Sequence, residues 1–351
     1  MPKTRTVRLG DRKIGPGQPV YIVAEAGVNH NGEASLAAEM IKVARDCGAD
    51  AVKFQAFNPE LMASRAAPLA PYQKRHVRSG RTQRTMLRDL QLSHGDFETL
   101  KKACEKCGMD FLVSPFDLES LDFLVRLSVK AIKIPSPELT NLPLLEGIAE
   151  ARIPALLSTG AATTGEVKEA VGTLQSHKLR DVALFHCVSA YPAPYEQSNL
   201  RAIATLEAGF GLPVGYSDHS PGIHLGAAAV AAGALLLEKH FTLDRGLPGP
   251  DQALSLEPSE LHSFVTAVRQ VESALGDGVK KPQPSEIEVR DATRKSLVTT
   301  RAVKRGEKFA AADLTTKRPG TGIPPREMKR IVGRRAKCDI PADTVLTTDM
   351  V

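Results

Sequence analysis

Residues 215–251 read GYSDHSPGIHLGAAAVAAGALLLEKHFTLDRGLPGPD, and this stretch decides the fold. Two apolar segments in and beside it, Val214–Ser217 and Ala234–Glu238, predict short buried strands. The run of small residues between them, Leu225–Ala232, is long enough for one helix, so the three segments predict a strand–helix–strand crossover. We therefore expect the two strands to be parallel and to end at the same edge of a sheet.

A histidine follows each of these strands, His219 in SDH and His240 in EKHFT. Two neutral imidazoles at one strand edge can bind the same divalent metal ion, whereas one histidine alone is more often a structural residue. Further polar groups stand beside both histidines and favour a functional site: Ser217, Asp218, Glu238 and Asp251.

The same alternation of strands and helices occupies the chain from Tyr21 to Leu275. Six further strands are predicted, at Tyr21–Glu25, Ala51–Phe54, Asp110–Val113, Ala131–Ile134, Ala155–Ser158 and Ala183–Cys187. Helices are predicted at Ser35–Cys47, Asp96–Cys107, Leu118–Leu127, Thr164–Leu174, Leu200–Ala208 and Ser259–Leu275. Eight such units predict an α/β fold, the TIM (β/α)8 barrel. A doubly wound open sheet is the alternative, but no GxGxxG sequence follows the first strand.

Composition divides the chain into three parts. Residues 1–279 are expected to form the barrel, with a small hairpin at Arg5–Gly15 closing its bottom. Residues 280–291 are a polar, proline-bearing linker. Residues 292–351 predict a small β-rich domain, because Ala302–Leu314 is weakly repeated in Cys338–Met350.

The segment Asn58–Leu92 is too long for an ordinary loop between a strand and a helix. Its basic residues would lie on the catalytic face: Lys74, Arg75, Arg78, Arg81 and Arg84. We expect a partly mobile lid over the site, with a merely solvated insertion as the alternative.

The composition restricts the class of protein. Its 351 residues, 42% hydrophobic and 25% charged, are typical of a soluble globular protein. We expect a cytoplasmic protein without a membrane partner, because no apolar run reaches spanning length and the N-terminus lacks a signal core.

Five scattered cysteines argue against a disulfide framework, and Cys104 and Cys107 form a CEKC pair without the second pair of a zinc site. The net charge of +6 suits anionic small molecules; nucleic acid is not expected, because the chain has no Trp and only Tyr72 is near the basic cluster.

Polar residues also follow the other strands, where a TIM barrel has its active site. They are Glu25, Lys53, Gln55, Ser114, Lys133, Ser136, Glu138, Ser158, Ser189 and Tyr191. A rim salt bridge is the alternative for Glu25 or Lys53 taken singly. Together, lysine cations and serine hydroxyls suit a phosphate and a carboxylate, and a metal on the two histidines would act as a Lewis acid on a carbonyl oxygen. The residues thus predict a metal-assisted reaction between a phosphorylated anion and a carbonyl compound.

Nine motifs along the chain resemble the sialic acid synthase family: AEAGVNHNG, VKFQ, IKIPSPELTN, LLSTG, HCVSAYPAPYE, GYSDHS, LEKHFTLD, GPDQALSLEP and KRPGTG. The resemblance covers nearly the whole chain and implies a TIM barrel followed by an antifreeze-like (SAF) domain. It implies condensation of phosphoenolpyruvate with an N-acetylated hexosamine to a nine-carbon 2-keto acid and phosphate. N-acetylmannosamine, giving N-acetylneuraminate, is the main expectation. N,N'-diacetyllegionaminate from 2,4-diacetamido-2,4,6-trideoxymannose is the alternative.

The resemblance also implies roles for individual residues. Those that would bind phosphoenolpyruvate are Lys53, Ser114, Lys133, Ser136, Ser158 and Ser217. His219 and His240 would bind a divalent ion, Mn²⁺ in the first place and Mg²⁺ or Co²⁺ otherwise. Those that would face the sugar are Glu25, Gln55, Glu138, Ser189, Tyr191 and Asp251, with Glu25 or Glu138 moving protons. Arg318 would reach the sugar from the SAF domain of the partner in a domain-swapped homodimer.

The chain departs from the family pattern at three positions. Pro135 and Pro137 flank Ser136 where glycines are usual, and Ser189 stands where some members have Asn. Two other functions remain open. The tail also resembles type III antifreeze protein, which suggests a carbohydrate- or ice-surface-binding protein without enzymatic activity. Lys53 or Lys133 could instead form the Schiff base of an aldolase.

Overall fold

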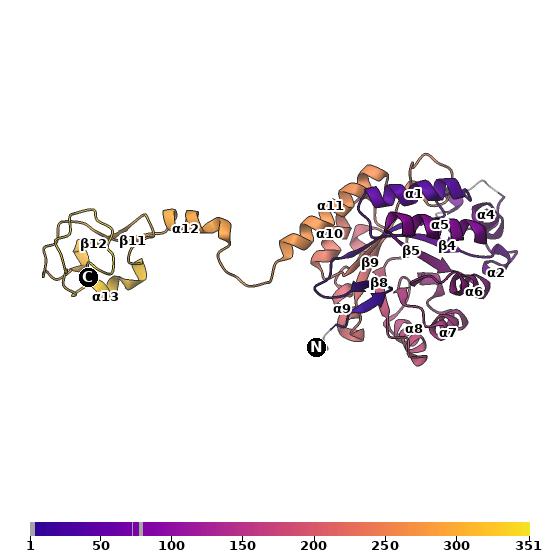
Figure 1. The fold of residues 1–351 in the computed structure, drawn as a ribbon, viewed down its shortest axis with the longest axis horizontal. Coiled ribbons are helices and arrows are strands. Elements are labelled where there is room, and N and C mark those ends of the chain that lie inside the picture. The colour runs from indigo at the N-terminus through magenta and orange to yellow at the C-terminus, as the bar shows by residue number, and fades with distance from the viewer. Residues whose placement is uncertain (1–3, 72, 77–79) are drawn as a thin grey trace. The chain divides into compact units, whose positions relative to one another are not determined.

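The computed structural model describes residues 4–71, 73–76 and 80–351. The chain forms two compact units, Met1–Gly276 and Asp277–Val351 (Figure 1). No helix within the described ranges is both long and apolar enough to cross a membrane.

The first unit is a closed barrel of eight parallel strands, which confirms the predicted TIM barrel. The strands are β3 (Tyr21–Gly27), β4 (Ala51–Ala56), β5 (Asp110–Pro115), β6 (Ile132–Ile134), β7 (Ala155–Ser158), β8 (Val182–Cys187), β9 (Val214–Asp218) and β10 (Leu236–His240). They neighbour one another in sequence order, and β10 closes the ring against β3. Each lies where it was predicted, with ends displaced by at most two residues.

Side chains alternate along each strand between the barrel interior and the layer of helices. In β10, Leu236 belongs to the interior apolar cluster and Leu237 to the outer one. In β3, Val23 is interior in the same way. The next inward positions are Glu238 and Glu25, so the interior changes from apolar to charged toward the carboxyl ends of the strands.

A hairpin of β1 (Val7–Leu9) and β2 (Arg12–Ile14) closes the other end. Its Val7, Leu9 and Ile14 are buried in the interior cluster, as the predicted bottom plug requires.

Helices surround the strands (Figure 1). They are α1 (Ala34–Asp46), α5 (His94–Cys107), α6 (Leu118–Arg126), α7 (Leu142–Ala151), α8 (Thr164–Ser176), α9 (Ala202–Phe210), α10 (His224–Ala231) and α11 (Pro258–Leu275). Capping boxes start α5 at Ser93 and α8 at Thr163. The sequence did not predict α7, whose N-cap Asn141 makes no capping side-chain bond. Cys104 on α5 is buried and Cys107 half-buried; both are free thiols.

The insertion after β4 contains α2 (Pro59–Met62), α3 (Gln73–His76) and α4 (Gln83–Leu90). It encloses a small apolar cluster with Val28, Phe57, Ala63, Leu69, Met86, Leu87 and Leu90. Its basic side chains Arg84 and Arg88 form ion pairs with Glu60, and Arg81 pairs with Asp89. Arg78, Tyr72 and the side chain of Arg75 lie outside the described residues.

The second unit is a small domain with an antiparallel pair, β11 (Ser296–Thr299) and β12 (Leu314–Lys317), and α13 (Met328–Ile331). Val303 of the first repeat copy forms an antiparallel bridge with Ile340 of the second, and both lie in one apolar core. Part of the segment predicted as a linker is helical, as α12 (Ile287–Thr293). Short 3-10 turns complete the chain: η1 (Ser136–Glu138), η2 (Tyr195–Gln197), η3 (Gln252–Leu254), η4 (Pro284–Glu286), η5 (Ala311–Asp313) and η6 (Pro325–Glu327).

Candidate active site

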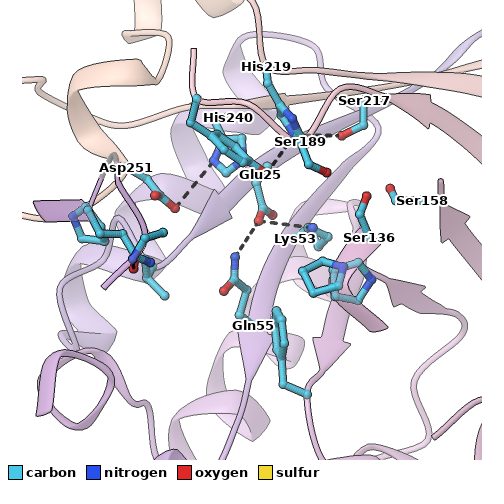
Figure 2. Close-up of a pocket in the computed structure, with 18 of the residues that line it drawn as sticks. Glu25, Lys53, Gln55, Ser136, Ser158, Ser189, Ser217, His219, His240 and Asp251 are labelled. Atoms are coloured by element: carbon cyan, nitrogen blue, oxygen red, sulfur yellow. Dashed lines mark hydrogen bonds and ion pairs between the residues drawn. The ribbon is translucent and has the colours of Figure 1, made fainter. Parts of the chain in front are cut away.

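A cavity of about 650 Å³ opens at the carboxyl ends of the barrel strands. Most residues predicted for the site line it: Glu25, Lys53, Gln55, Lys133, Ser136, Ser158, Ser189, Tyr191, Ser217, His219, His240 and Asp251. Figure 2 shows many of these side chains converging from different strands on one space. Such convergence is the arrangement expected for a TIM-barrel active site.

Glu238 stands at the centre of the charged floor. Its Oε1 accepts hydrogen bonds from Lys133 Nζ at 3.0 Å and Lys53 Nζ at 3.2 Å, and Ser217 Oγ donates to it at 3.3 Å. Burial would raise the pKa of this carboxyl, but Lys133 and Lys53 outweigh burial and lower it to about 2. Glu238 therefore stays ionised and binds both lysines in one place.

Lys53 lies between two carboxylates. Its Nζ is 3.2 Å from Glu25 Oε1, a contact drawn in Figure 2, and also 3.2 Å from Glu238 Oε1. Burial alone would lower the pKa of Lys53, but Glu238 and Glu25 raise it to about 12. Burial lowers the pKa of Lys133, while the nearby Glu238 carboxylate favours its ammonium form. An ion-paired lysine is poorly suited to form a Schiff base, which needs a neutral amine.

Glu25 is the less satisfied carboxylate. Gln55 Nε2 donates to its Oε1 at 3.0 Å, while its buried Oε2 has no hydrogen-bond partner among the described residues. Burial raises the pKa of Glu25, and the charge of Glu238 adds to this effect. Glu25 is thus able to hold a proton inside the cavity.

The two histidines lie side by side, with ring centroids 5.6 Å apart (Figure 2). His219 Nδ1 is 2.7 Å from the carbonyl oxygen of Val188, which fixes a proton on that nitrogen. Its Nε2 is left as the acceptor, 3.2 Å from Tyr191 Oη. Burial lowers the pKa of His219 to about 4 and that of His240 well below its ordinary value, so both rings are neutral at pH 7.

These residues fit a divalent metal ion. His240 Nδ1 and one oxygen each of Glu25 and Glu238 are buried without partners among the described residues. Neutral imidazole and carboxylate groups are ligands for such ions. No cluster of three or more potential ligands is already assembled within the described ranges.

Asp251 lies beside His240, with Oδ2 4.0 Å from Nδ1. Burial, followed by the charge of Glu25, raises the pKa of Asp251 to about 7. At this distance the two groups are close enough to interact through a bound hydroxyl group or water.

A second part of the floor offers hydroxyl and amide donors. Ser136 Oγ accepts a bond from Gly160 N at 3.0 Å, and Ser158 Oγ is buried without a partner among the described residues. A Cβ on Gly160 would lie 2.2 Å from Ser189 Oγ and 2.8 Å from Ser136 Oγ, so any side chain there would displace both hydroxyl groups. This hydroxyl-lined niche lies on the same floor as Lys133 and suits an anion.

Two residues predicted for the site, Ser114 and Glu138, do not line the cavity of the barrel. Ser114 is completely buried in β5. Glu138 in η1 is half-buried and accepts a bond from Asn141 Nδ2 at 2.6 Å. Arg318 is an exposed residue of the second unit. Conversely, the strand-end pattern assigns Glu238 no role beyond standing beside the histidines, although its position two residues before His240 in β10 places it on the same inward face.

Comparison with known proteins decides the family. Residues 40–280 match the NeuB family, and residues 294–351 match the SAF domain. The chain belongs to the NeuB family. The resemblance to the sialic acid synthases is thereby confirmed, and the chain is an enzyme of the NeuB family of nonulosonic acid synthases.

This NeuB-family chain is similar to two named proteins and to one solved structure. It is 45% identical to the N,N'-diacetyllegionaminic acid synthase of Campylobacter jejuni, over 93% of this chain and 98% of that protein. It is 42% identical to the protein of the same name from Legionella pneumophila, over 96% of each. One solved crystal structure is named N-acetylneuraminic acid (sialic acid) synthetase, from Leptospira borgpetersenii. It is 38% identical to this chain and superposes with a TM-score of 0.72, over 82% of this chain and 95% of the solved one.

Proposed function

We propose that this NeuB-family enzyme is an N,N'-diacetyllegionaminate synthase. It would condense phosphoenolpyruvate with 2,4-diacetamido-2,4,6-trideoxymannose and release phosphate. The observation that carries this proposal is the 42–45% identity to two proteins named N,N'-diacetyllegionaminic acid synthases, along nearly the whole chain. The alternative from the sequence thus replaces N-acetylneuraminate as the favoured product.

The charges of the cavity support the phosphoenolpyruvate half of this reaction. Lys133 and Lys53 would neutralise the anion, and the hydroxyls of Ser136, Ser158 and Ser217 would donate hydrogen bonds to it. Glu238 holds both ammonium groups in position before substrate arrives. Such preorganisation reduces the cost of orienting charges during the reaction.

The reaction requires proton transfers after the new bond forms. C3 of phosphoenolpyruvate attacks the aldehyde carbon of the open-chain sugar, water adds at C2, and phosphate leaves with cleavage of its C–O bond. We assign the proton transfers to Glu25 rather than Glu138, because Glu25 lines the cavity with an oxygen that has no hydrogen-bond partner among the described residues, whereas Glu138 bonds Asn141 outside it. A divalent ion held by His219 and His240 would supply Lewis acidity toward the sugar carbonyl oxygen.

The test is an assay of phosphate release by the purified enzyme with Mn²⁺ and phosphoenolpyruvate. The acceptors compared are 2,4-diacetamido-2,4,6-trideoxymannose, N-acetylmannosamine and N-acetylmannosamine 6-phosphate, with the product identified by mass. We expect the diacetamido sugar to have the highest kcat/KM. A higher value for either of the other sugars contradicts the proposal.

N-acetylneuraminate synthesis is the second candidate. It is favoured by the solved sialic acid synthetase, which shares 38% identity with this chain. The cavity floor suits either acceptor, because both sugars present the same aldehyde to phosphoenolpyruvate. The distinction must come from the part of the cavity that contacts the other end of the sugar.

A further inference from the structure

The cavity has two unlike halves. Most of the candidate anion-binding residues come from one side of the ring: Lys133 and Ser136 (β6), Ser158 (β7) and Ser217 (β9), while Lys53 of β4 reaches the same floor through Glu238. The segments after β3, β4 and β5, across the ring, supply a different surface. This surface, here called the apolar wall, consists of Val28, Met62, Met86, Leu87, Leu90 and Phe116.

The apolar wall is a built structure rather than a loose loop. Met86, Leu87 and Leu90 of α4 are nearly buried in the cluster that the insertion forms with Val28, and Met62 and Phe116 pack against it. Arg84 Nη1 bonds Glu60 Oε2 of α2 at 2.6 Å, and its Nε bonds the carbonyl of Ala63 at 2.9 Å. These bonds tie α4 to α2 and hold the wall at the mouth of the barrel.

The apolar wall offers no counter-ion for a charged group. Among the described residues that line the cavity, the ammonium groups are those of Lys53 and Lys133, and both are on the floor with Glu238. Arg84 and Arg88 of α4 are paired with Glu60 of α2. A phosphate placed against the six side chains of the apolar wall would therefore lose water without gaining a partner from them.

We infer that the apolar wall recognises the acceptor sugar by its methyl groups, those of C6 and of the acetamido group on C4. This inference rests on the proposed function. The aldehyde carbon must reach phosphoenolpyruvate on the charged floor, so the C4–C6 end of the sugar points away from the anion-binding half. In that direction lies the apolar wall, at whose margin Gln83 adds an amide that can bond an acetamido group.

The chemical differences between the candidate acceptor sugars give the expected substrate selectivity. A methyl group in an apolar pocket raises kcat/KM by about 10–200-fold over a substrate that lacks it. N-acetylmannosamine carries hydroxyl groups at C4 and C6, which would be desolvated against methionine and leucine side chains. The apolar wall therefore favours the 4-acetamido-6-deoxy sugar over N-acetylmannosamine and its 6-phosphate.

The test exchanges wall methionines for a polar side chain of similar length. Met62→Gln and Met86→Gln are assayed with both 2,4-diacetamido-2,4,6-trideoxymannose and N-acetylmannosamine at saturating phosphoenolpyruvate. We expect kcat/KM for the diacetamido sugar to fall at least about 10-fold and that for N-acetylmannosamine to fall less than about 3-fold. The KM for phosphoenolpyruvate should not change.

Two controls separate recognition from folding. Leu61 precedes Met62 on α2 but is 54% exposed and does not line the cavity, so Leu61→Gln should leave the ratio of the two sugars unchanged. Met86→Leu keeps the packing of the buried Met86 and should retain the preference. If the Met→Gln variants leave the ratio of the two kcat/KM values unchanged, whether or not both values fall, the role of the apolar wall is overturned while the proposed product stands. A wild-type preference for N-acetylmannosamine or its 6-phosphate rejects the proposed product itself.

Discussion

At the scale of single residues, the site is organised by one carboxylate shared between two lysines. Glu238 contacts Lys53 and Lys133 at 3.2 and 3.0 Å, and all three side chains are almost completely buried. Three charges can remain in such a place only if they compensate one another. When Glu25 is counted as well, the two negative charges of Glu25 and Glu238 equal the two positive charges of Lys53 and Lys133. A bound anion would add negative charge to this group, and Glu25 could then accept a proton.

The first prediction concerns the two floor lysines. Lys133→Met and Lys53→Met should each weaken phosphoenolpyruvate binding by about 1.5–3 kcal/mol, the value of a hydrogen bond to a charged group. Calorimetric titration of phosphoenolpyruvate into each variant measures the effect, and a thermal melt checks the fold. Sugar affinity should change less.

Lys130→Met is the matched control for this series. It removes the same charge three positions before Lys133, but Lys130 is half-exposed near Asp110 and does not line the cavity. Its affinity for phosphoenolpyruvate should equal that of the wild type. Unchanged affinity in both floor variants would remove these lysines from the anion site.

The second prediction concerns the histidines. His219→Ala and His240→Ala should abolish turnover yet melt close to the wild-type temperature, because the two rings line a cavity and contribute little to the core. A chelator should inactivate the wild-type enzyme, and added Mn²⁺ should restore its activity. In calorimetry, Mn²⁺ should bind to the metal-free wild type and bind more weakly to both variants. Full activity of thoroughly metal-free enzyme would exclude a metal role.

Most of the candidate site was predictable because parallel strands place their carboxyl ends at one edge. That rule selected Lys53, Lys133, His219 and His240 without any knowledge of distances. It could not show that Glu138 bonds Asn141 instead of facing the cavity, because η1 turns its side chain aside. Side-chain hydrogen bonds of this kind depend on local backbone turns, which a pattern of alternating strands and helices does not predict.

At the scale of elements, the eight strands and the barrel helices other than α7 followed from the alternation of apolar segments, whereas the helices of the insertion did not. The capping box at Ser93 starts α5 at His94, two residues before the predicted start at Asp96. The insertion has short helices of four to eight residues, too short for a periodic pattern to be read. Its importance came from where α4 packs, and only the structure supplies that.

The third prediction compares two helical glycines. A Cβ on Gly226 of α10 would lie 2.1 Å from the Phe264 ring of α11, so Gly226→Ala should destabilise the barrel by about 1–3 kcal/mol through overpacking. Gly172 of α8 has no atom within 4 Å of that position, so Gly172→Ala should stabilise by about 0.5–1 kcal/mol. Denaturant titrations of both variants test this, and a shift of the same sign in both would refute the packing argument.

At the scale of the whole molecule, the chain joins the barrel, which contains the candidate active site, to a small SAF domain. The loop around Arg318 in that domain is tightly built: a Cβ on Gly322 would lie 2.4 Å from the carbonyl oxygen of Leu346, and one on Gly320 would lie 2.6 Å from Arg294 Cβ. The exposed guanidinium of Arg318 is therefore presented by a fixed backbone. An arginine so presented can hydrogen-bond an acyl oxygen of a sugar.

The last prediction tests whether Arg318 acts on a partner's barrel in a homodimer. Arg318→Ala should raise the KM for the sugar while sparing phosphoenolpyruvate binding, because the candidate anion site lies wholly within the barrel. Coexpression of Arg318→Ala with His240→Ala should yield heterodimers that regain part of the activity. If the small domain serves the other subunit, one of the two sites in such a dimer combines an intact barrel with an intact Arg318. If Arg318 serves its own barrel, each site contains one defect, and a purified heterodimer carrying two different tags will be no more active than its parents.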